Sequence, residues 1–233
     1  MKVHVTASSS HLHQFKTVVV VDVFRSSSTI ITALGNGAKC VIPFTNLSKA
    51  VRAHRTSRLS TILAGERKGV TPAHFDYNIS PFEMSPENVS GRTLLYSSSN
   101  LTRILSRLEK RHRILVGAII NARAVANYLE ARDDDVAIVP CGTRLGTAIE
   151  DLAGGGAIAA SIGHADFSDD ALAAIGFFNA KEWKNLVKQG RIAARLKALG
   201  FQKDVDFCLK LNSNSVVPGL VGNKIVNIAR FAT

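Results

Sequence analysis

The chain has 233 residues, of which 46% are hydrophobic and 20% charged, so it can bury the core of one large domain. This balance excludes a wholly disordered, collagenous or coiled-coil chain. Lys and Arg together number 29 against 18 Asp and Glu, and the resulting net charge of +11 favours an anionic partner such as a phosphorylated metabolite, nucleic acid or an acidic membrane surface.

The first strong strand signal is the β-branched run at residues 18–23, whose lack of alternation is typical of a strand covered on both faces. The polar residues 25–29 and the apolar residues 30–34, closed by glycine, predict a helix directly after it. Similar units follow, with strands at 40–44, 93–96, 114–117 and 136–139 and helices at 47–54, 101–108, 122–131 and 149–161. This alternation predicts an α/β fold with a largely parallel sheet.

Residues 68–90 interrupt the alternation of strands and helices. They contain several prolines and few periodic apolar positions, which predicts a long loop of the kind that covers a site. Residues 169–178 and 181–199 predict two consecutive helices, and residues 216–231 an irregular or strand-forming return to the body. Because no clear linker divides the chain, we expect one domain over residues 1–233, with a helical C-terminal subregion near residues 168–200.

A first candidate site follows the buried run at 18–23. Asp22 lies at the carboxyl end of the predicted strand, where ligands gather in parallel α/β sheets. Arg25 and the hydroxyl groups of the next residues lead into a helix, whose amino end can bind an oxyanion. Alternatively, Ser27 or Ser28 caps the helix and Asp22 pairs with Arg25. A haloacid-dehalogenase-type phosphatase needs a second acid at the position of Phe24, which weakens that assignment.

Three further polar segments follow predicted strands or begin helices. Glu66 could bind a divalent cation while Arg67 and Lys68 neutralise an anionic ligand, although an ordinary solvated turn uses the same residue types. A run of hydroxyl and amide groups stands at a third helix entrance and contains Ser98, Ser99, Asn100 and Arg103. Glu150 and Asp151 begin another helix, where acids serve either a metal or proton-transfer role or simply the helix dipole.

Together and in this order, these segments make the chain resemble the 2-phosphosulfolactate phosphatase, or ComB-like, family. The resemblance spans nearly the whole chain. The matching stretches are residues 22–29, 64–69, 75–81, 97–103, Gly117 with 121–122, 141–143 with 150–151, 168–169 and 206–208. The chain departs from the family pattern at Leu101, where glycine is usual, and at residues 78–79, where Gly-Asn is usual.

The resemblance implies a three-layer α/β/α fold with a largely parallel or mixed sheet. It also implies a Mg²⁺-dependent phosphoric monoester hydrolase that converts 2-phosphosulfolactate into 3-sulfolactate and phosphate. In methanogens this step belongs to coenzyme M biosynthesis, and members elsewhere can act on another substrate. The substrate is therefore expected to be a small phosphorylated and sulfonated compound.

The residue chemistry leads us to expect these roles. Mg²⁺ is held by Asp22, Glu66 and Asp151, because this cation prefers oxygen ligands. The catalytic residues are Asp22, Arg25 and Glu66, and either a water molecule attacks with Asp22 or Glu66 as base, or Asp22 attacks to form an aspartyl phosphate. Substrate oxygens are bound by Ser26, Ser27, Ser28, Arg67, Ser98, Ser99, Asn100 and Arg103.

Two other functions remain open from the sequence, namely a non-catalytic binder of phosphorylated metabolites and a nucleic-acid-associated protein, the latter less favoured because no nucleic-acid motif accompanies the charge. The three cysteines form no CxxC pair and stand among apolar neighbours, so we expect them to be reduced in a cytoplasmic protein. No apolar stretch approaches the roughly 18 residues of a spanning helix, so we expect no membrane insertion. We also expect a homodimer, the commonest closed assembly.

Overall fold

The computed structural model describes the chain except for residues 7–11, 109–110, 144–145 and 232–233. Ten strands form one mixed sheet in the order β4-β5-β3-β10-β9-β6-β2-β7-β1-β8. They are β1 (Lys2–Val5), β2 (Thr17–Val21), β3 (Cys40–Pro43), β4 (Thr61–Gly65), β5 (Thr93–Ser97), β6 (Arg113–Gly117), β7 (Val136–Pro140), β8 (Asp166–Phe167), β9 (Pro218–Val221) and β10 (Lys224–Asn227).

Helices flank this sheet, which confirms the expected three-layer α/β/α fold. They are α1 (Ser26–Gly35), α2 (Leu47–Thr56), α3 (Pro86–Val89), α4 (Leu101–Leu105), α5 (Ala122–Glu130), α6 (Ile149–Ala159), α7 (Asp169–Asn179), α8 (Trp183–Gln189), α9 (Arg191–Ala198) and α10 (Gln202–Cys208). Short 3-10 turns lie at Leu12–Gln14, Pro81–Glu83, Ile119–Asn121 and Ile228–Phe231.

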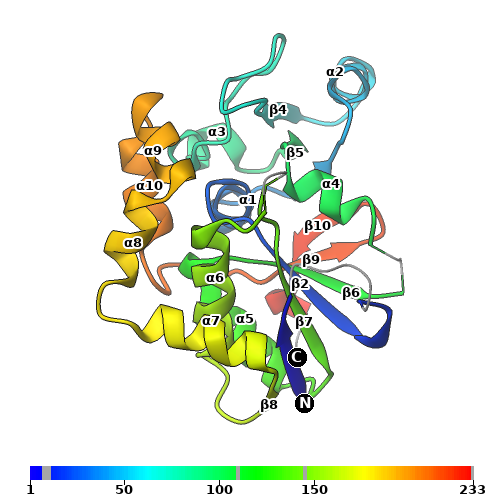
Figure 1. The fold of residues 1–233 in the computed structure, drawn as a ribbon. Coiled ribbons are helices and arrows are strands. Elements are labelled where there is room, and N and C mark those ends of the chain that lie inside the picture. The colour runs from blue at the N-terminus through cyan, green and yellow to red at the C-terminus, as the bar shows by residue number, and fades with distance from the viewer. Residues whose placement is uncertain (7–11, 109–110, 144–145, 232–233) are drawn as a thin grey trace.

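The sheet consists of two parallel parts joined by a hairpin. Strands β6, β2, β7, β1 and β8 run parallel to one another, and so do β3, β5 and β4. The antiparallel hairpin β9–β10 lies between them and pairs with each part through a single residue pair, Leu115 with Gly219 and Ile225 with Val41. In Figure 1, α1 lies between the two parts. The sheet is therefore mixed: an antiparallel hairpin separates its two parallel parts.

The central strand β2 is buried at all five positions, as its unbroken apolar sequence predicts. Its neighbours β6 and β7 pair with it in register along its whole length, from Thr17 to Val21. The valines of β2 belong to a continuous hydrophobic core that also includes residues of α1, α5, α6 and the C-terminal helices. This packing fixes the position of the segment that begins at Asp22.

The predicted single helix at 181–199 is wrong in detail, because the chain breaks at Gly190 into α8 and α9. Gly190 has an extended ψ of 151°, and a Cβ there would lie 2.7 Å from Ile149 Cγ2 and 2.9 Å from the carbonyl oxygen of Val187. The helix α10 then follows, and Figure 1 shows α8, α9 and α10 stacked along one side of the molecule.

Two other expectations can be compared with the structure. The cysteines Cys40, Cys141 and Cys208 are free and buried, as expected. None of the helices within the described ranges is long and apolar enough to span a membrane.

Candidate active site

Asp22 follows directly after β2 and begins a tight turn into α1. Its backbone N–H donates to Ser27 Oγ at 2.9 Å, and its carbonyl oxygen accepts from the Ser27 N–H at 2.8 Å. Ser28 Oγ donates to the carbonyl oxygen of Val23 at 3.0 Å. The hydroxyl groups of Ser27 and Ser28 are therefore buried and hydrogen-bonded within the turn, where they hold Asp22 at the end of the strand.

The carboxylate of Asp22 is almost fully buried among other acids. Its Oδ2 accepts a hydrogen bond from the backbone N–H of Leu101 at 3.2 Å, which connects the end of β2 to the start of α4. Burial, helped by the nearby carboxylates of Glu66 and Glu150, raises the pKa of Asp22 to about 7 against the opposing hydrogen bond from Ser26. A carboxylate in this environment can accept a proton near neutral pH.

Glu66 follows directly after β4, which belongs to the other parallel part of the sheet. Its Oε1 accepts from the backbone N–H of Ser99 at 2.7 Å, and its Oε2 from the N–H of Gly69 at 2.9 Å. Gly69 has a φ of +81°, the left-handed conformation that favours glycine. The side chain is therefore fixed by backbone groups of two loops.

Asp151 lies in the first turn of α6 and is also tied to backbone groups. Its Oδ1 accepts from the N–H of Val23 at 2.8 Å and its Oδ2 from the N–H of Gly142 at 2.9 Å. Burial raises the pKa of Asp151 well above its usual value, and the neighbouring Asp22 and Glu150 add to this effect. Burial likewise raises the pKa of Glu150 to about 7, although Arg191 opposes it. The end of β2 thus lies in a concentration of buried acids.

A cavity of about 100 Å³ opens beside Asp22. It is lined by Asp22, Phe24, Arg25, Ser26, Glu66, Lys68, Gly69, Ile79, Ser99, Asn100, Ile192, Arg195 and Leu196. These residues come from the ends of β2, β4 and β5, from the loop after β4 and from α9. The cavity is therefore the place where the carboxyl ends of strands from both parallel parts meet.

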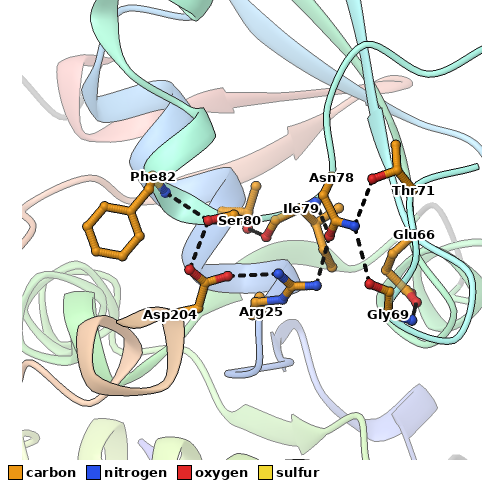
Figure 2. Close-up of polar contacts among 10 residues, drawn as sticks. Arg25, Glu66, Gly69, Thr71, Asn78, Ile79, Ser80, Phe82 and Asp204 are labelled. Carbon is orange, nitrogen blue, oxygen red and sulfur yellow. Dashed lines mark hydrogen bonds and ion pairs between the residues drawn. The ribbon is translucent and has the colours of Figure 1, made fainter. Parts of the chain in front are cut away.

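Arg25 lines the cavity, but its guanidinium group is also bound within the protein (Figure 2). Its Nη1 donates to Asp204 Oδ2 at 2.7 Å and its Nη2 to Asn78 Oδ1 at 2.8 Å. The guanidinium carbon also lies 4.0 Å from the centre of the Phe201 ring. Because Asp204 carries the opposite charge and is equally buried, the charge of Arg25 is compensated inside the protein.

Asp204 and Asn78 extend this network to other segments (Figure 2). Ser80 Oγ donates to Asp204 Oδ1 at 2.9 Å, and Asn78 Nδ2 donates to Thr71 Oγ1 at 2.9 Å. The loop 68–90 and α10 are therefore fastened to the turn that contains Arg25. The segment predicted as a loop contains the 3-10 turn Pro81–Glu83 and α3, and it lines the cavity through Lys68, Gly69 and Ile79.

The sequence profile of the family described as 2-phosphosulpholactate phosphatase matches residues 3–223. The chain belongs to the 2-phosphosulfolactate phosphatase family. This is an enzyme family of phosphoric monoester hydrolases, as the resemblance of the motifs predicts.

Curated relatives within this 2-phosphosulfolactate phosphatase family match most of the chain, and each carries the name probable 2-phosphosulfolactate phosphatase. The protein of Caldanaerobacter subterraneus subsp. tengcongensis is 35% identical over 88% of this chain and 88% of its own length. That of Thermotoga petrophila is 34% identical over 91% and 92%, and that of Clostridium botulinum is 32% identical over 98% and 100%.

In this 2-phosphosulfolactate phosphatase family member, six of the predicted site residues line the cavity, namely Asp22, Arg25, Ser26, Glu66, Ser99 and Asn100. The others lie outside its lining. Arg67 turns away, with Nη1 on the carbonyl oxygen of Glu66 at 2.7 Å and Nη2 on Ser97 Oγ at 2.9 Å. Ser98 precedes α4, and its Oγ accepts from the N–H of Thr102 in that helix at 3.4 Å. Arg103 lines a separate cavity of about 730 Å³ beside the ends of β1 and β7.

Sequence reasoning gave no role to several residues that the fold brings to the site. Asp204 and Asn78 bind Arg25, and Arg195 lines the cavity from α9. The one local signal was Asp204, an acid next to apolar Val205 in a helix that buries both. Arg195 stands in a run of exposed basic residues that looks like an ordinary solvated helix face.

The carboxylates at the cavity are of the type that binds a divalent cation such as Mg²⁺. Within the described residues, no three His, Cys, Asp or Glu side chains are grouped as a ready-made metal site. Asp22 and Glu66 nevertheless line the same cavity, and Mg²⁺ commonly uses only one or two carboxylates together with waters and substrate phosphate. Asp151 does not line the cavity. The donor set at the cavity therefore fits Mg²⁺ through Asp22 and Glu66.

Proposed function

We propose that this protein is a Mg²⁺-dependent phosphatase that hydrolyses 2-phosphosulfolactate to 3-sulfolactate and inorganic phosphate. One observation carries the proposal: Asp22 and Glu66, two buried carboxylates, line a small cavity with exposed basic residues, in a chain that matches the family from residue 3 to residue 223. The names of the curated relatives support the substrate.

Asp22 and Glu66 would hold the metal ion, and Asp151 would fix the turn that follows Asp22, because its Oδ1 accepts from the Val23 N–H. When bound, Mg²⁺ would neutralise the charge that develops on the phosphoryl group. Glu66 is held by the N–H groups of Gly69 and Ser99, so its orientation is set before substrate enters. The repulsion between Asp22 and Glu66 favours a cation in the cavity.

Asp22 is the residue best placed for the bond-making step. As general base it would take a proton from an attacking water, whose oxygen forms a bond to phosphorus while the ester P–O bond breaks and the leaving alkoxide is protonated. As nucleophile it would form an aspartyl phosphate while the ester P–O bond breaks and the alkoxide leaves with a proton from water, and a second water would then hydrolyse the aspartyl phosphate. The N–H of Leu101, which donates to Oδ2, keeps the carboxylate directed in either case.

The remaining lining residues would bind the substrate. Ser26, Ser99 and Asn100 bring hydroxyl, backbone and amide groups to the cavity wall, and these suit phosphoryl oxygens. Arg25 would position the turn and add a positive potential rather than a free charge, because Asp204 neutralises it.

The three buried free cysteines support a cytoplasmic setting, and a homodimer is the expected assembly.

The test is phosphate release from 2-phosphosulfolactate, 2-phospholactate and phosphoglycerates, measured with Mg²⁺ and again with a chelator. We expect release from 2-phosphosulfolactate that the chelator abolishes and added Mg²⁺ restores. Release that survives the chelator would contradict the metal requirement. A folded sample that binds these compounds without releasing phosphate would instead be a binder of phosphorylated metabolites.

A further inference from the structure

Two exposed basic residues stand at the mouth of the Asp22 cavity, although they come from segments more than a hundred positions apart in the chain. Lys68 belongs to the loop after β4, and Arg195 belongs to α9. The Arg195 guanidinium Nη2 donates a hydrogen bond to the carbonyl oxygen of Lys68. Lys68 has a φ of +54°, in the left-handed region, and this conformation belongs to the loop that contacts Arg195. The pair therefore joins the C-terminal helices to the rim of the cavity.

The rim and the interior of the cavity carry opposite charges. The interior acids Asp22 and Glu66 are 4% and 8% exposed, whereas Lys68 and Arg195 are exposed at the surface. In the part of the chain that the structure describes, neither Lys68 nor Arg195 lies within ion-pair distance of a carboxylate. Arg25, the third cation at the cavity, is compensated by Asp204. The positive charges available to a ligand are therefore those at the rim.

The cavity is large enough to hold only one part of a substrate. A volume of about 100 Å³ is far below the roughly 300–1,000 Å³ of pockets that enclose a whole drug-sized ligand. A phosphoryl group directed at Asp22 and Glu66 thus leaves the rest of the molecule at the rim. There it would meet a guanidinium group, whose planar donors suit a carboxylate or sulfonate, and an ammonium group.

We propose that Lys68 and Arg195 bind the second anionic group of the substrate, a carboxylate or sulfonate, and so select phosphorylated acids over phosphate esters of neutral alcohols. This inference rests on the proposed phosphatase function, since it places the phosphoryl group inside the cavity. It assigns a specificity role to α9, a helix outside the strand-end motifs.

The test compares 2-phospholactate with isopropyl phosphate, which has the same branched ester but a methyl group in place of the carboxylate. We expect Arg195→Gln and Lys68→Gln each to lower the ratio of kcat/KM for 2-phospholactate to that for isopropyl phosphate by about 10- to 100-fold, the loss typical of one charge-assisted hydrogen bond. Lys197→Gln removes one charge from the same helix at a position that does not line the cavity, and it should keep the wild-type ratio.

An unchanged ratio in both rim variants, or an equal fall in Lys197→Gln, would overturn the inference. Thermal unfolding of each variant checks that it is folded. If the wild-type protein releases phosphate from neither compound, calorimetric titration with the same two compounds still tests the rim; the proposed function itself has failed only if 2-phosphosulfolactate is not hydrolysed either. Selective weakening of 2-phospholactate binding in Arg195→Gln would then support the inference, and equal binding by wild type and variant would overturn it.

Discussion

The buried carboxylate of Asp22 lowers the stability of the folded chain near neutral pH. Its carboxylate is buried beside Glu66 and Glu150, and burial raises its pKa from 3.8 to about 7. The folded chain thus binds this proton more tightly than the unfolded chain does, so the contribution to stability decreases as the pH rises from about 4 to about 7. Residues that lower stability in this way are typical of functional sites.

Leu101 contacts the site through its backbone and the hydrophobic core through its side chain. Its N–H donates to Asp22 Oδ2, while its side chain is fully buried in the hydrophobic core. It is not among the described residues with positive φ, so the backbone here does not require glycine, even though glycine is usual at this position in the family pattern. The departure at Leu101 therefore leaves the contact to Asp22 intact.

This packing gives a prediction for Leu101→Gly. We expect the free energy of unfolding to fall by roughly 3–5 kcal/mol, because a cavity replaces the buried side chain and glycine weakens the first turn of the helix. Chemical denaturation measures the change, and Leu101→Met, which nearly conserves volume, should cost less than about 1.5 kcal/mol. A glycine variant as stable as wild type would show that Leu101 does not pack as described.

At the scale of elements, α6 carries three consecutive glycines that allow close packing on two sides. A Cβ on Gly154 would lie 2.6 Å from Val23 Cγ2 and 2.7 Å from Val21 Cγ1, directly beneath the site turn. A Cβ on Gly156 would meet the backbone carbonyl of Ala174 in α7. Since α6 begins with Glu150 and Asp151, this packing sets the distance of those acids from β2.

Two glycine substitutions on neighbouring helices should have opposite effects. Gly156→Ala forces α6 and α7 apart, because the clash is with backbone atoms, and we expect it to cost more than about 2 kcal/mol. Gly176→Ala, in the interior of α7 with open space around the new Cβ, should stabilise by about 0.5–1 kcal/mol. Thermal or urea unfolding compares them, and a destabilised Gly176→Ala together with a neutral Gly156→Ala would contradict this packing.

Several elements could be predicted because their signals are local. The unbroken valine run predicted β2, and the glycine-closed apolar run predicted α1. The break at Gly190 was not predicted, although glycine weakens a helix, because the nearness of Ile149, which a Cβ on Gly190 would meet, depends on tertiary structure. The short strand β1 carries too few residues for a clear pattern, and its pairing with β7 is decided by tertiary structure.

At the scale of the whole molecule, the site is assembled from distant segments. Asp22 and Glu66 could be predicted as partners because both follow apolar strands, even though those strands lie in different parallel parts of the sheet. Asp204 and Arg195 could not be placed, because their contacts with Arg25 and Lys68 span 179 and 127 positions in the chain. The end of a strand can be predicted from local sequence, whereas the packing of distant helices against it cannot.

The central claim is that Asp22 performs the chemistry, and Asp22→Asn tests it most directly. The amide keeps the shape of the side chain but is neither a base nor a nucleophile, so we expect kcat for 2-phosphosulfolactate with Mg²⁺ to fall by at least about 100-fold. The melting temperature at neutral pH should stay equal or rise, because a buried charge is removed. Asp166→Asn, which neutralises an exposed acid on β8, should retain wild-type kcat. A folded Asp22→Asn variant with near-normal turnover would contradict the account.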